Sequence, residues 1–297
     1  MIETPQKPFS IHRFAQHHAT EVAIAALAVI LYGPLLIHWC DGWLTKSISI
    51  EHEYFSHGLI GLPFAGYLAW IKRNKWQALP SHGHLVGGVL LITGMLLYLS
   101  PMVDLINLSL PITLTGLCLW LKGLKGVRLM VFPLLLVFLA TPNEIPYLIA
   151  PYTLPLQKFI AGVAGFLLWQ MGMDVTVEQI YIYVNDRIVE VAPYCAGLKM
   201  LFTSLYAGMM LTYWTELWKQ REKVVAFFVG IIALSVIANI MRNTVLTFFH
   251  GTGRDAAFAW FHEGWGGDVY SALLLGSLII LVHQLDRPPS PQQDSAP

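Results

Sequence analysis

The sequence is poor in charge, and neither sign of charge is in excess. Only 12% of its 297 residues are charged, whereas roughly 25% are charged in ordinary soluble domains, and this deficit argues against a soluble fold. Lys and Arg together number 18, as do Asp and Glu, so the formal net charge is zero. Composition therefore gives no indication of a nucleic-acid partner or a strongly acidic partner.

Cysteine is also scarce. The chain has three, Cys40, Cys118 and Cys195, and no CxxC pair. An odd number without close spacing disfavours both a disulfide framework and a clustered metal site, so we expect no metal and no other cofactor. Cys40 ends the first apolar run and Cys118 lies inside another, and we interpret both as packing residues.

Apolar residues make up 56% of the chain and gather in runs of membrane length, which a soluble core would not need. The first run is not followed by a small-residue cleavage site, so we expect it to remain as an anchor. Eight runs predict eight transmembrane helices: Val22–Cys40, Tyr54–Ile71, Leu85–Val103, Leu105–Leu121, Leu129–Asn143, Ala196–Trp214, Val224–Met241 and Val269–Gln284.

A ninth apolar region, Ile145–Met173, differs from the others. Lys158 lies at its centre, and Pro151 and Pro155 interrupt its first half. We expect this region to lie along the membrane interface or to re-enter the membrane. The predicted fold class is therefore an all-α polytopic membrane protein with about eight spans.

Loop charge orients this arrangement, because cytoplasmic loops are enriched in Lys and Arg. With the N-terminus inside, the inner segments hold 12 of the 18 basic residues. A further span at residues 145–173 would move the basic cluster at 219–223 to the outside, against the rule. We expect both termini to be cytoplasmic and the chain to lie in the bacterial cytoplasmic (inner) membrane.

Between Met173 and Cys195 the apolar residues alternate with polar ones, and Asn185–Asp186 lies between two alternating runs. This pattern predicts a short β-hairpin on the extracytoplasmic side. We divide the chain into a cytoplasmic tail at residues 1–20, one transmembrane domain at residues 21–285 and a disordered cytoplasmic tail at residues 286–297.

Cys195 follows the hairpin and is expected at or just before the start of the next helix. A thiol at a helix N-terminus is shifted toward the thiolate by the unpaired N–H groups and the helix dipole, and Lys199 adds positive charge one turn later. The other interpretation is a buried structural cysteine, which is equally common for such a residue.

Arg242 closes an uncharged run that begins at Val224, about 27 Å of helix from its inner end. Asn239 and Asn243 share its face at helical spacing. An arginine at membrane depth is costly and indicates function, and its five donors suit an oxyanion or a carboxylate. The alternative is a snorkelling arginine that anchors the helix end.

His262 lies in an aromatic, glycine-rich segment on the outer side, before the last span. Histidine is the side chain best suited to proton transfer near neutral pH, and Glu263 or Asp268 could orient its ring. A histidine that merely lies at the interface beside tryptophans is the alternative. His57 and His250 are also expected on the outer side and compete for the same role.

Loop charge alone places Cys195, Arg242 and His262 on one face of the membrane. A thiolate, a cation and an acid/base group in one place indicate acyl transfer through a thioester. A transporter or channel with a polar path through Arg242, Asn239 and Lys199 is the main alternative. A metal-dependent hydrolase using His57, His250 and His262 is a second, although no HExxH-like spacing supports it.

Three segments resemble the exosortase/archaeosortase family in order and spacing. They are Pro-Tyr-Cys-Ala-Gly-Leu-Lys at 193–199, Asn-Ile-Met-Arg-Asn at 239–243 and Phe-His-Glu-Gly-Trp-Gly-Gly-Asp at 261–268. Ser-His-Gly at 56–58 is also similar, so the resemblance covers roughly residues 20–285. The run Trp-Gly-Gly-Asp-Val-Tyr-Ser-Ala is most similar to the cyanobacterial branch.

The resemblance implies a membrane-embedded cysteine transpeptidase that acts on exported proteins with a C-terminal PEP-CTERM-type tail: a short motif, a hydrophobic helix and a basic cluster. Cys195 would be the nucleophile, His262 the proton shuttle, and Arg242 would stabilise the oxyanion or position His262. The acceptor that resolves the thioester would be water or an amine. This chain has Ala196 and Lys199 where many relatives have serine and arginine, which bears on substrate choice.

Overall fold

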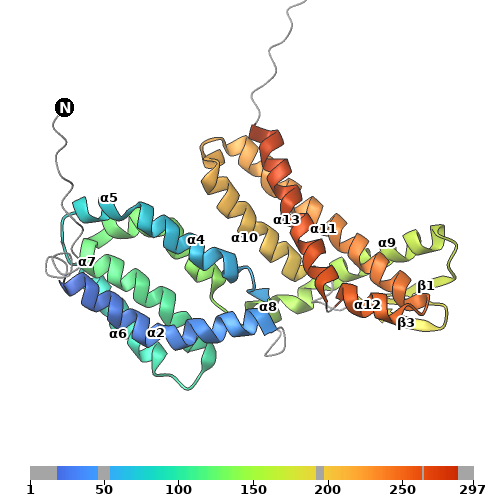
Figure 1. Ribbon diagram of the computed structural model, residues 1–297, viewed down its shortest axis with the longest axis horizontal. Coiled ribbons are helices and arrows are strands. Elements are labelled where there is room, and N and C mark those ends of the chain that lie inside the picture. Colours follow the sequence, from blue (N-terminus) through green and yellow to red (C-terminus); the bar gives the residue numbers. More distant parts are fainter. Residues whose placement is uncertain (1–18, 46–53, 192–196, 263, 287–297) are drawn as a thin grey trace, which may run out of the picture.

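The computed structural model describes residues 19–45, 54–191, 197–262 and 264–286. The described residues form helices and one small sheet, arranged as two side-by-side helical groups (Figure 1). The first group contains α2 (Ala19–Thr45), α4 (Gly58–Ile71), α5 (Arg73–Ala78), α6 (Leu85–Tyr98) and α7 (Val103–Ala140). The second contains α9 (Leu154–Gln170), α10 (Leu198–Trp214), α11 (Arg221–Gly251), α12 (Asp255–His262) and α13 (Trp265–Asp286).

Helix α7 reverses direction at Gly123, whose φ of +61° is not helical. The side-chain amide of Asn107 donates to the carbonyl of Pro142 at 3.2 Å, although a straight helix would place these residues about 52 Å apart. The reversal lies in the basic segment Lys122–Arg128, where the sequence predicts an inner loop between two spans. The Lys122 ammonium closes this end of the hairpin by donating to the carbonyl of Leu79 at 2.8 Å.

By length and composition, four described helices can cross a membrane: α2, α7, α11 and α13. Helices α4 and α6 are apolar but shorter. The all-α membrane class is therefore confirmed, while the count of eight spans stays a prediction.

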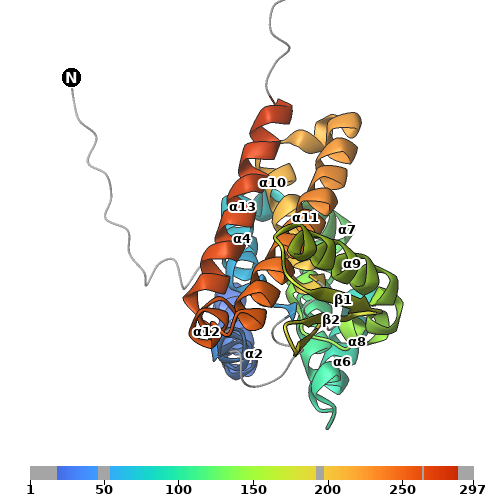
Figure 2. The ribbon, with the colours of Figure 1, turned by 90° about the vertical axis from the view of Figure 1, so that its right-hand side faces the viewer.

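The region predicted to lie at the interface or to re-enter folds as three consecutive helical pieces. They are α8 (Ile145–Ile149), the 3-10 helix η1 (Ala150–Thr153) and α9. Helix α9 packs along α11 and over the sheet (Figure 2). Lys158 is exposed on α9, whereas Ile160, Ala164 and Leu168 on its other face are fully buried.

The sheet is an antiparallel meander of β1 (Val175–Glu178), β2 (Tyr181–Val184) and β3 (Arg187–Glu190) in that order. Strands β2 and β3 form the predicted hairpin, and Asn185 and Asp186 both have positive φ in its turn, as a two-residue hairpin turn requires. The sequence prediction was incomplete because it treated residues 175–182 as one strand. Gln179, with φ of +61°, breaks that run into β1 and β2.

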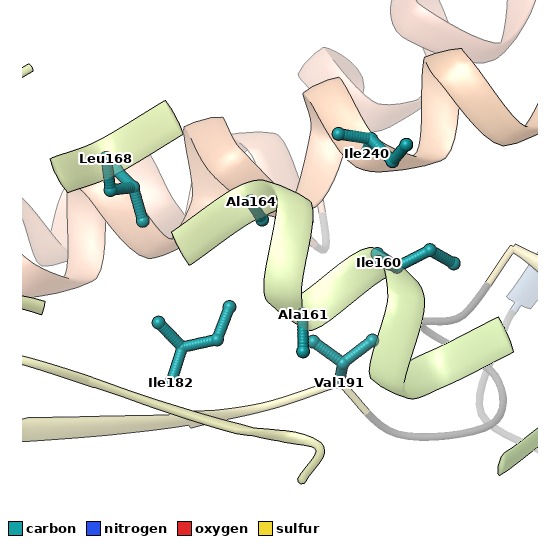
Figure 3. Packing of buried hydrophobic residues seen from close by; sticks show 7 residues of the cluster. All are labelled: Ile160, Ala161, Ala164, Leu168, Ile182, Val191 and Ile240. Carbon is teal, nitrogen blue, oxygen red and sulfur yellow. The ribbon is translucent and has the colours of Figure 1, made fainter. Parts of the chain in front are cut away.

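The core of the second group joins α9, the sheet and α11 (Figure 3). Ile182 of β2 and Val191, just after β3, are fully buried against α9. Ile240 of α11 belongs to the same cluster. The packing of Ile240 in this cluster therefore holds the part of α11 that also carries Asn239 and Arg242.

Candidate active site where α10, α11 and α13 meet

Cys195 and Glu263 lie outside the described residues, but the residues on either side of them are described. Helix α10 begins at Leu198, three residues after Cys195, and not at or just after the cysteine as the sequence predicted. The cause is Gly197, which caps the helix in the left-handed conformation with φ of +79°. Lys199 lies half-buried in the first turn of α10.

Gly197 lies directly against Asn239 of α11. A Cβ atom added at Gly197 would come within 2.6 Å of the side-chain carbon Cγ of Asn239. On the other side of residues 192–196, Val191 packs in the cluster that contains Ile240. Gly197 is therefore held directly against α11, whereas Val191 is held in the core that α9 shares with α11.

Replacing Gly197 by Ala should lower the activity of this site at least tenfold, because the methyl group would displace Asn239. Gly172→Ala is a matched control, since Gly172 has a similar φ of +81° but open space around it. Both variants carry the left-handed strain of about 1–2 kcal/mol. Thermal unfolding should shift similarly in the two, and equal activity in them would contradict the importance of the Gly197 contact.

Asn239 and Asn243 form one polar pair at the interface between α10 and α11. Their exposed fractions are 1% and 3%. The amide of Asn243 donates to the backbone carbonyl of Asn239 at 2.9 Å and to its Oδ1 at 3.1 Å. Among the described residues, Nδ2 of Asn239 is buried and has no hydrogen-bond acceptor. This donor lies on the side of Asn239 that faces Gly197.

Arg242 lies one turn further along α11 and faces the start of α13. A Cβ atom added at Gly267 would lie 3.9 Å from the Nη2 atom of Arg242. The same added atom would lie 3.7 Å from the backbone oxygen of His262. The Nε atom of Arg242 is buried and has no acceptor among the described residues. Tyr270 fixes this junction, because its hydroxyl donates to the carbonyl of Ala238 at 2.5 Å.

Arg242 and the backbone oxygen of His262 thus both border Gly267 at the start of α13, and Arg242 and Asn239 each have a donor that no described group satisfies. Buried polar groups are normally hydrogen-bonded. Among the described residues, these two donors lie one turn apart on α11 and can donate to a further hydrogen-bonding group.

His262 is the last residue of α12, a short helix where the sequence indicated only an outer loop. Its ring is half-buried and stacks on Phe258, one turn earlier, with the planes 8° apart and the centroids 5.2 Å apart. His250, at the end of α11, lies on Phe258 at 5.4 Å. Phe258 was missed in the sequence, although its spacing of four residues from His262 is the signal that could have found it.

Helix α12 is docked to the sheet by an exposed ion pair. Arg187 of β3 donates to Asp255 at 2.6 Å, and Asn185 donates to the carbonyl of Gly251 at 3.1 Å. The hydrogen bond from Arg187 is the main reason that the pKa of Asp255 lies below its usual value of 3.8. A depressed pKa of this kind stabilises the docked helix above about pH 3.8, and the effect is lost as the pH falls through the lower folded-state pKa.

Hydrogen exchange of the α12 amides checks this ion pair. In the wild type, protection of α12 should decrease as the pH is lowered below 3.8, once intrinsic exchange is corrected for. In Asp255→Asn, protection should be lower already at neutral pH and should lack this step. Glu178→Gln, at an exposed acid of the same sheet, should behave as the wild type. A pH step that persists in Asp255→Asn would contradict the assignment.

His57 lies elsewhere, at the contact between α4, α7 and α10. Its Nε2 is 3.1 Å from the carbonyl of Leu139, and its ring lies on that of Tyr206, 4.3 Å between centroids. Tyr206 is nine residues along α10 from Gly197, about 14 Å of helix. In the part of the chain that the structure describes, no three His, Cys, Asp or Glu side chains gather to hold a metal. The histidine set of the metal-hydrolase alternative is therefore not assembled.

Asp268 lies exposed in the first turn of α13, where a carboxylate complements the helix dipole. Cys40 and Cys118 are free and half-buried, in agreement with packing roles. Of the sequence-predicted residues that are described, Asn239, Asn243 and Arg242 share one face of α11 at its junction with α10 and α13, and the backbone of His262 lies near that junction while its ring stacks on Phe258. His57 does not lie near the junction.

Comparison with known proteins supplies one match. The model of the transmembrane exosortase family matches residues 43–279, well over half of the chain. No curated protein and no solved structure matches. The matched region contains α4 to α12, most of α13 and the whole junction around Arg242.

Proposed function

The chain belongs to the transmembrane exosortase family, and on this premise we propose that it is a membrane-embedded cysteine transpeptidase. It cleaves the C-terminal PEP-CTERM-type sorting signal of exported proteins through a thioester. The active site faces the extracytoplasmic side of the cytoplasmic membrane, and Cys195, Arg242 and His262 carry the reaction.

The contact between Gly197 and Asn239 is the observation that carries this proposal. Two residues of chain reach at most about 7 Å, so Cys195 is tethered close to Gly197 and hence to Asn239. Arg242 lies one turn from Asn239, and both Arg242 and the backbone oxygen of His262 lie within 4 Å of the position that a Cβ of Gly267 would take. These contacts come from independent parts of the chain and support the proposal that Cys195, Arg242 and His262 act at one site.

In the first step, the thiolate of Cys195 attacks the backbone carbonyl carbon at the cleavage motif. The C–S bond forms, the carbonyl π electrons move to oxygen, and a tetrahedral oxyanion results. The C–N bond then breaks, and the amine of the departing tail takes a proton from His262. Water or an amine attacks the thioester next, gives its proton to His262 and returns the sulfur as a thiolate.

Arg242 and Asn239 have a shared electrostatic role in this scheme. The oxyanion develops negative charge that fixed donors stabilise most strongly in a site from which water is excluded. The Nε of Arg242 and the Nδ2 of Asn239 are buried and have no acceptor among the described residues. They need little reorganisation to receive this oxygen.

The experiment is a processing assay with a defined substrate. An exported domain carrying a PEP-CTERM-type tail is expressed in a host without such enzymes, with and without this chain. The mass of the substrate is then followed. We expect loss of the tail only when the chain is present, and the new C-terminus will identify the cleaved bond and the acceptor. Retention of the full tail beside an accumulated, membrane-inserted chain would refute the proposal.

A further inference from the structure

An apolar cavity of about 280 Å³ lies on the boundary between the two helical groups. Figure 1 shows α4 facing α10 across this boundary, with α13 beside α10. The lining comes from α4, α10 and α13 and from His57 just before α4, and it includes Ile60, Phe64, Ala207, Leu275 and Ile279. We call this cavity the α4/α10/α13 groove.

The groove opens outward. Ile60 and Ile279 line it and yet have exposed fractions of 58% and 54%. Both residues belong to apolar helices, so in a membrane their exposed side chains face the lipid hydrocarbon. Between helices in a bilayer, burial in protein gains little over burial in lipid, and association depends on close packing against small residues. Ala207 supplies such a residue in the groove wall.

The groove runs away from the candidate active site along two helices at once. On α10, its lining begins at Thr203, six residues or about 9 Å beyond Gly197. On α13, Leu275 and Ile279 lie about 12 and 18 Å beyond Gly267. Helices α10 and α13, which border the junction at Arg242 and Asn239, therefore also form two walls of the groove, whose lining begins about 9 Å of helix beyond Gly197.

The far end of the groove has the features of a membrane interface. It is lined there by Trp214, and Trp214, Trp70 and Trp218 are all more than half exposed. Tryptophans concentrate at the membrane–water boundary, and Lys72 lies over the neighbouring Tyr213 ring at 5.3 Å. From Gly197 to Trp214 is about 25 Å of helix, close to the thickness of the hydrocarbon core.

We propose that the α4/α10/α13 groove binds the membrane-spanning helix of the substrate's tail, alongside α10 and parallel to it. This inference rests on the proposed function, because it assigns the occupant from the substrate that the site would cleave. A chain cut at the outer end of α10 and spanning the bilayer directly afterwards must descend beside that helix. The groove lines about 17 Å of this path, from Thr203 to Trp214 on α10, and a helix fits it by inserting a ridge of side chains spaced three and four residues apart.

Photo-crosslinking tests the occupant directly. Benzoylphenylalanine is placed at Ile60 or Ile279, in the full chain with Cys195→Ala so that the tail is retained. The control position is Val229, which is 61% exposed on α11 and does not line the groove. The probe substrate is an exported domain with a cleavage motif, an apolar helix of about 20 residues and a tagged basic end. We expect crosslinks to the tail helix at Ile60 and Ile279 at least tenfold stronger than at Val229.

A second variant measures the consequence for processing. Ala207→Phe places a bulky ring in the groove, and we expect tail removal to fall at least tenfold while the chain accumulates normally in the membrane. Val229→Phe is the matched control and should process as the wild type. If the Ala207→Phe variant does not accumulate in the membrane, the crosslinking experiment alone tests whether the groove binds the tail helix.

The outcomes separate this proposal from the one on which it rests. Tail removal by the wild type without crosslinks at the groove overturns the groove assignment and leaves the peptidase. Crosslinks at the groove without tail removal by the wild type overturn the peptidase and leave a tail-binding protein. Equal crosslinks at all three positions, or crosslinks to a second copy of the chain in place of the tail, also overturn the groove assignment.

Discussion

Cys195→Ala should abolish tail removal, with the processed fraction falling at least a hundredfold. The thiolate is the group that forms the acyl intermediate, and alanine offers no substitute. Cys195→Ser should be almost as inactive, because a serine hydroxyl at neutral pH is a far weaker nucleophile unless a base activates it. The measurement is the mass of the substrate after coexpression, normalised to the amount of chain in the membrane.

The other two cysteines provide the control for this result. Cys40 and Cys118 are free and half-buried in the first group of helices, remote in sequence from the junction at Arg242. Cys40→Ala and Cys118→Ala should process substrate within about twofold of the wild type, the change expected where no reacting group is removed. Normal processing by Cys195→Ala would refute the thioester and would favour the transporter alternative, which has no need of a thiol.

Arg242→Ala should reduce tail removal by about a hundredfold to a thousandfold, the usual loss when one donor to a developing oxyanion is removed. Arg242→Lys keeps the charge but replaces a planar fork of donors with a single ammonium. We therefore expect it to recover less than a tenth of the wild-type rate. Rates come from the time course of substrate mass at saturating substrate, so that a loss of binding is distinguished from a loss of chemistry.

Arg254→Ala is the matched control for Arg242. Arg254 lies between α11 and α12 and packs over the ring of Phe248 at 5.3 Å, and it does not border Gly267. Its replacement should leave the rate within a few-fold of the wild type. Full activity in Arg242→Lys would indicate that only positive charge matters, which would contradict a directional role for the guanidinium.

Much of the candidate site was predictable because helical spacing is a local property. Asn239, Arg242 and Asn243 share a face of α11 whatever packs against it, and their polarity in an apolar run marked that face. The hairpin turn was predictable for the same reason, since Asn185 and Asp186 tolerate positive φ better than other residues. The basic segment 122–128 likewise indicated the reversal of α7.

The remaining features depend on tertiary contacts that no local pattern carries. Helix α10 begins after Gly197, which is left-handed, and Asn239 occupies the space that a side chain at this position would need. Gln179 adopts positive φ and divides one expected strand into two. The partners of His57, Leu139 and Tyr206, come from distant parts of the chain that its local sequence does not indicate.

Four contacts that join α11 to its neighbours are made by one short stretch of this helix. Ala238 accepts from Tyr270, Asn239 touches Gly197, Ile240 packs on α9, and Arg242 faces Gly267. These residues span about 6 Å of helix rise, whereas α11 is 31 residues long. Hydrophobic mismatch with a thicker or thinner bilayer is absorbed by helix tilt and by the helix ends. A change in lipid chain length can therefore tilt α11 as a whole without separating the groups gathered on this one turn.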